Sequence, residues 1–118
     1  MTTVSGYAKI IVTLQRKEVD DVLTIIPDMD SDGYYVTFDQ RSVKNRTCRY
    51  FGNSILADYI RTFFQTILSD TDLPAHVQID CPMFPTVILP PFHLEGYFPL
   101  LEKQIDTLQD DWPYETAP

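Results

Sequence analysis

Three stretches of this chain alternate apolar and polar side chains with a period of two residues, the pattern of a strand buried on one face. These stretches are residues 7–15, 34–39 and 75–81. Three further strand candidates are rich in β-branched or aromatic residues, namely 21–27, 47–51 and 86–90. Asp32-Gly33, a hairpin signal, connects two of the candidates, so we expect a mostly antiparallel sheet of five or six strands.

A different period, with apolar positions every three to four residues, occurs at residues 54–69 and predicts an amphipathic helix. A second helix is expected at about 98–110, opened by Pro99 in its first turn. This order of elements predicts an α+β fold with both helices on one face of the sheet. We expect a single domain over residues 1–112 and a frayed tail over residues 113–118.

The charged residues are distributed unevenly along the chain. Residues 1–57 sum to zero, whereas residues 58–118 carry ten acidic residues against Arg61 and Lys103, which accounts for the net charge of −8. Such a half repels phosphate backbones and attracts basic surfaces, although acidic residues also simply keep a small protein in solution. No apolar run approaches the roughly 18 residues that span a bilayer, and no secretory leader is evident, so we expect a cytoplasmic protein with no membrane contact.

One polar segment has the spacing of a cation site. It resembles the opening of an EF-hand calcium loop, D-x-D-x-D-G, and places a fourth carboxylate at the twelfth position; the matching residues are Asp28, Asp30, Asp32, Gly33 and Asp39. Carboxylates two residues apart can converge on one hard cation, so calcium is the cofactor that this pattern predicts. The flanking residues are strand-like, however, and the alternative is a polar hairpin turn without a metal.

A basic segment precedes the first helix. Arg41, Lys44, Arg46 and Arg49 lie within residues 41–51 and are followed by two aromatic residues. Basic and aromatic side chains together can bind single-stranded nucleic acid through charge and stacking. The acidic second half opposes the approach of nucleic acid, so this hypothesis is secondary, and a solvated loop is the alternative.

The residues available for catalysis are few. The two histidines are His76 and His93, and no nucleophile or nucleotide-binding motif is present. His76 and Asp80 share a strand face but lie roughly 13 Å apart, too far for a hydrogen bond, and Cys81 points to the opposite face. We therefore predict no catalytic residues. An enzyme that uses His93, His76, Asp80 or Cys81 is kept as an alternative.

The leading hypothesis is a non-catalytic protein-binding module, an inhibitor or adaptor, with no resident cofactor. The prolines and aromatic residues of 84–98 form a stiff segment that loses little entropy on binding. The segment also offers a homodimer interface at residues 84–92, because the strand candidate there is apolar on both faces. The expected partner is a protein with a basic surface, and one version of the hypothesis is mimicry of nucleic-acid charge. The predicted contact residues are Phe92, His93, Tyr97, Glu102, Asp106, Asp110 and Asp111.

Overall fold

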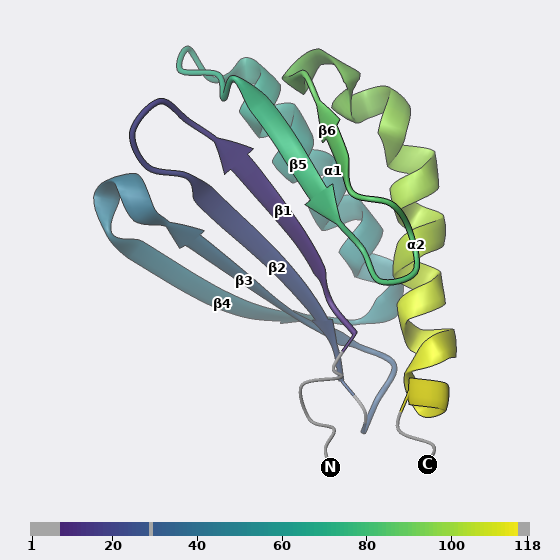
Figure 1. The fold of residues 1–118 in the computed structure, drawn as a ribbon. Coiled ribbons are helices and arrows are strands. Elements are labelled where there is room, and N and C mark those ends of the chain that lie inside the picture. Colours follow the sequence, from purple (N-terminus) through teal and green to yellow (C-terminus); the bar gives the residue numbers. More distant parts are fainter. Residues whose placement is uncertain (1–7, 29, 116–118) are drawn as a thin grey trace.

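Two layers, a sheet and a pair of helices, make up the fold of residues 8–28 and 30–115, the part of the chain that a computed structural model describes (Figure 1). The sheet has six strands in the order β4-β3-β2-β1-β5-β6, and each neighbouring pair is antiparallel. Both helices cover the same face of the sheet, so the predicted α+β class is confirmed. The elements are β1 (Ile10–Gln15), β2 (Asp21–Pro27), β3 (Tyr34–Gln40), β4 (Asn45–Phe51), α1 (Asn53–Ser69), β5 (His76–Asp80), β6 (Val87–Leu89) and α2 (Leu94–Glu115).

The alternation seen in the sequence sets which strand face is buried. Along β1, Ile10, Val12 and Leu14 are buried, and the residues between them are half-buried on the other side. Val12 stands opposite Leu23 of β2 and Ile79 of β5, so one apolar row crosses the middle of the sheet. This row packs against the apolar stripe of α1, which consists of Leu56, Ile60, Phe64 and Ile67.

Aromatic contacts join the helices to the sheet and to each other. Phe63 of α1 meets Phe38 of β3 edge to face at 5.2 Å between ring centroids. Phe64 of α1 meets Phe98 of α2 in the same way at 6.2 Å. Tyr34 is fully buried at the start of β3 and its hydroxyl donates to the Ile105 carbonyl of α2 at 3.1 Å. The start of β3 is therefore fixed against the second half of α2.

The second helix begins earlier than the sequence indicated. A short 3₁₀ turn, Pro91–His93, runs directly into α2 at Leu94, so Pro99 is the sixth residue of the helix rather than part of its first turn. Pro91 is the proline that opens the helical segment, since its missing N–H falls where no helical partner exists. The helix also continues to Glu115, past the end expected at residue 110 and into the predicted tail of residues 113–118, of which 116–118 lie outside the described residues.

The two edges of the sheet are exposed. At one edge, all residues of β4 before Phe51 are exposed, because only Phe51 reaches the helix layer, where it stacks on Tyr59 at 4.4 Å. At the other edge, β6 is only three residues long and Ile88 is 56% exposed on the face without helices. Within the described residues, only one of the two faces of β6 is therefore packed against the rest of the protein. The other face of β6 is open to solvent. A homodimer in which a second copy of the chain covers this face stays a prediction.

Candidate functional site

The aspartate-rich loop joins β2 to β3 and is organised by its own hydrogen bonds. The backbone N–H of Asp28 donates to the Gly33 carbonyl at 2.9 Å. Both carboxylate oxygens of Asp28 accept from within the loop, one from the Asp30 backbone N–H and one from the Ser31 hydroxyl, each at 3.0 Å. Asp39 lies at the opposite end of β3 and faces Arg41 at 3.4 Å. The four predicted calcium ligands do not converge, and no three acidic, His or Cys residues gather as a metal site in the described residues.

The basic segment forms β4 and the turn before it. Arg41, Lys44, Arg46 and Arg49 are exposed, as the nucleic-acid hypothesis requires. Near the end of β4, Tyr50 packs edge to face on Tyr35 of β3 and its hydroxyl contacts Ser31 of the aspartate-rich loop. The aromatic pair therefore adjoins three aspartates, whose charge repels phosphate. Nucleic-acid binding by this strand stays a prediction.

The candidate catalytic residues are dispersed. His76 and Asp80 stand at opposite ends of β5, and the Asp80 carboxylate accepts from Gln78 at 2.9 Å and from Thr86 at 2.7 Å. Cys81 is buried, and burial raises the pKa of its thiol to about 11, which keeps it protonated at neutral pH. His93 is exposed beside the start of α2. No hydrogen bond or ion pair joins any two of the four across the described residues.

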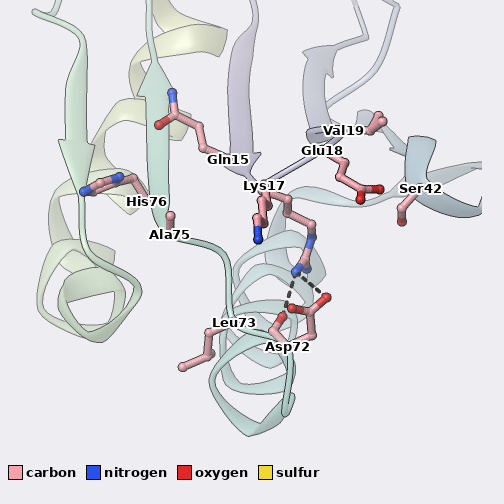
Figure 2. A pocket seen from close by; sticks show the side chains of 10 residues that line it. Gln15, Lys17, Glu18, Val19, Ser42, Asp72, Leu73, Ala75 and His76 are labelled. Atoms are coloured by element: carbon pink, nitrogen blue, oxygen red, sulfur yellow. Dashed lines mark hydrogen bonds and ion pairs between the residues drawn. The ribbon is translucent and has the colours of Figure 1, made fainter.

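An open cleft lies at the end of the sheet where the β1–β2 turn is found (Figure 2). The sequence did not indicate this cleft. It has a volume of about 690 Å³. Figure 2 shows His76 and Ser42 on opposite sides with Lys17 between them. Its lining residues are Gln15, Arg16, Lys17, Glu18, Val19, Ser42, Asp72, Leu73, Ala75 and His76. Two basic residues, one histidine and two acidic residues share the cleft, so its charges largely cancel and favour neither an anion nor a cation.

A buried ion pair supports one wall of this cleft. The Arg16 Nε donates to Asp21 Oδ2 at 2.8 Å, and the Arg16 Nη1 donates to the backbone carbonyl of Asp72 at 2.6 Å. Asp21 is 1% exposed, and its other carboxylate oxygen has no hydrogen-bond partner among the described residues. The sequence segment 16–21 reads only as a polar turn, because the burial of Asp21 depends on the strand register and on the distant Asp72 loop.

The predicted partner-binding residues differ in exposure. Phe92 is 70% exposed and His93 is exposed, whereas Tyr97 is half-buried and its hydroxyl accepts from Gln104 Nε2 at 2.9 Å. On α2, Glu102 is half-buried and Asp106 is exposed. The side chains of the remaining two, Asp110 and Asp111, lie outside the described residues.

An acidic stripe follows one side of α2. With 3.6 residues per turn, Glu95, Glu102 and Asp106 fall within about 40° of one another around the helix axis. None of the three carboxylates forms an ion pair within the described residues, where the pairs present are Arg16–Asp21, Arg16–Asp72 and Arg41–Asp39. The basic residues of β4 therefore do not neutralise the helix layer.

Comparisons with known proteins add no constraint on this site. No protein-family model matches the chain, and searches of curated proteins and of solved structures found no significant match. No helix of the described part of the chain combines the length and the apolar character that crossing a bilayer requires.

Proposed function

We propose that this protein is a non-catalytic binding module whose helix layer presents an acidic surface to a basic protein. The observation that supports the proposal is a set of helix carboxylates that form no ion pair among the described residues. Within the described residues the carboxylates of Asp58, Glu95, Glu102 and Asp106 have no ion-pair partner. The nearby Arg61 lies over the Phe98 ring at 4.6 Å. Arg61 and Lys103 are the basic residues that the described helices carry against these four acids, so the helix layer keeps a net negative charge that can attract an oppositely charged partner.

The fold adds the aspartate-rich loop to this acidic surface. Tyr34, the first residue of β3, donates its hydroxyl to the Ile105 carbonyl, and Tyr34 also pairs with Phe51 just before α1 begins. The loop before Tyr34, the first turns of α1 and the second half of α2 therefore meet at one end of the molecule (Figure 1). We call this the acidic end. Its described acidic residues are Asp28, Asp30, Asp32, Asp58 and Asp106.

The spacing of the acidic stripe suits a partner that normally holds nucleic acid. Glu102 and Asp106 are four residues apart, which corresponds to about 6 Å along the helix, and Asp110 continues this spacing in the sequence. A regular row of negative charges on a rigid helix is the feature that a basic nucleic-acid groove recognises without base contacts. Mimicry of nucleic-acid charge is the specific version of the function that we favour.

Matched charge reversals test the proposal. We expect a lysine- and arginine-rich peptide to bind in calorimetry at low salt and to weaken steeply as salt is added. The Glu102→Lys/Asp106→Lys variant should bind roughly tenfold or more weakly, about 1.4 kcal/mol. The control, Glu18→Lys/Asp70→Lys, changes net charge equally at the other end of the molecule and should lose much less. Equal losses in the two variants, or binding that is insensitive to salt, would refute the proposal.

A further inference from the structure

A small groove runs between the two helices on the outer side of the helix layer. It has a volume of about 260 Å³, larger than the roughly 150 Å³ that holds a benzene ring in an engineered cavity. Phe64 and Phe98 form its floor in edge-to-face contact, and the Arg61 guanidinium lies over the Phe98 ring. The lining residues are Arg61, Phe64, Gln65 and Leu68 from α1 and Glu95, Phe98 and Pro99 from α2.

Pro99 gives this apolar groove a polar feature. A proline inside a helix has no N–H, so the Glu95 carbonyl four residues earlier lacks its usual helical donor. Both residues line the groove, so the Glu95 carbonyl, which has no N–H donor at Pro99, is the acceptor that a side chain seated there would use. An aromatic ring that carries an N–H group satisfies both the apolar floor and this acceptor. Tryptophan and histidine have such a ring, and the indole of tryptophan is the larger and the more apolar of the two, so it fits the groove better.

The charged residues around the groove indicate which charge a bound partner segment should carry. Glu95 at the rim begins the acidic stripe that continues to Asp106, about 12 Å beyond Phe98 along α2. We propose that the groove binds a tryptophan of the basic partner, within a segment whose Lys or Arg side chains follow the tryptophan and lie along the stripe. This inference rests on the proposed function and adds to it the side chain that fixes the register of the partner. Aromatic anchors in small pockets commonly contribute most of the energy of an interface.

Synthetic peptides test the inference directly. The probe is a 16-residue helix-forming peptide with one tryptophan and with lysines four and eight residues after it, labelled with fluorescein and titrated by anisotropy. We expect replacement of the tryptophan by alanine to weaken binding at least tenfold. Replacement of the lysines by glutamates should abolish binding, because the acidic stripe then repels the peptide.

Variants of the protein locate the anchor. Gln65→Trp fills the groove from an exposed position of α1 and should abolish the advantage of the tryptophan peptide over its alanine version. Thr66→Trp, an exposed neighbour that does not line the groove, is the matched control and should leave this advantage unchanged. Pro99→Ala restores the helical N–H and should raise the melting temperature while weakening the tryptophan peptide several-fold. Circular dichroism verifies that each variant is folded.

The outcomes separate this inference from the function on which it rests. If the peptide binds with steep salt dependence but the alanine version and the Gln65→Trp variant bind equally well, the groove is not the anchor site and the acidic module still stands. If neither peptide binds at low salt, the proposed function fails and the inference fails with it. If Thr66→Trp abolishes the advantage as Gln65→Trp does, the effect is not specific to the groove and the inference is rejected.

Discussion

Removal of Arg16 should destabilise the protein strongly, because it leaves the carboxylate of Asp21 buried without its partner. Asp21 is 1% exposed, and its bond from Arg16 Nε is 2.8 Å long. Breaking a buried ion pair by deleting one partner costs about 3–5 kcal/mol. The Arg16 side chain is 16% exposed, so water reaches one edge of the pair, and we expect a loss near the lower limit, about 3 kcal/mol, for Arg16→Met.

This loss is large enough to measure by thermal unfolding. At about 2.1 cal/mol/K per residue, a chain of 118 residues changes its melting temperature by about 4 °C for each kcal/mol, so we expect a decrease of about 12 °C. Asp72→Ala is the matched control. The Asp72 side chain is 87% exposed and Arg16 bonds its backbone carbonyl, so its removal should cost less than about 0.5 kcal/mol.

A double variant distinguishes the loss of the charge pair from loss of packing by the arginine side chain. Arg16→Met/Asp21→Leu removes both charges, and replacing a buried pair by apolar residues is often neutral or stabilising, so most of the 3 kcal/mol should be recovered. Urea and thermal unfolding of the single and double variants give the comparison. A single variant that loses less than about 1 kcal/mol, or a double variant no more stable than the single, would show that Asp21 is hydrated and that the reasoning is wrong.

Four further predictions rest on local geometry. Cys48 should react with a thiol reagent in the folded protein, whereas Cys81 should react only after denaturation. Burial raises the Cys81 pKa from its ordinary value of 9.0 to about 11, so its contribution to stability should be complete below pH 9 and be lost as the pH rises towards 11, measurable by urea unfolding. Gly33→Ala should cost about 1 kcal/mol, because the added Cβ overlaps the outer end of the exposed Tyr50 ring, which then has to leave its contact with Tyr35, and Tyr50→Ala in the same chain should recover part of it. In calcium calorimetry, Asp39→Ala should not change any heat produced by the aspartate-rich loop, because Asp39 lies at the opposite end of β3; a smaller heat would contradict this separation.

The fold was predictable from the sequence where a single hydrophobic period extends over a whole strand or helix. The alternation of 7–15 and 75–81 correctly places Ile79 and Cys81 inside and His76 outside, and the apolar positions of 54–69 correctly predict the buried face of α1. These patterns need no long-range information, because each records which side of a single element faces the core. The predicted start of α2 was wrong. Proline is favoured in the first turn of a helix, and Pro99 was assigned to that turn, whereas Pro91, eight residues earlier, is the proline that occupies it.

The features that depend on contacts between distant segments were not predictable. Gly33 looks like a turn residue that needs a positive φ, but among the described glycines none has one. Its small size instead leaves room for the ring of Tyr50, 17 residues later. The groove forms where Arg61 and Phe64 of α1 meet Phe98 of α2. No local period in the sequence specifies how two amphipathic helices align, since many alignments bury the same stripes.

The acidic residues of α2 do not contribute equally to the stability of the helix. The C-terminal end of a helix carries partial negative charge, so acidic residues in the last turn are unfavourable by about 0.3–1 kcal/mol each and basic residues are favourable. The last turn of α2 contains no basic residue. Glu95 is well placed in the first turn of the helix, whereas Asp106 lies outside both terminal turns and forms no ion pair among the described residues. The basic partner that we propose would supply the counter-charge for Asp106 on binding.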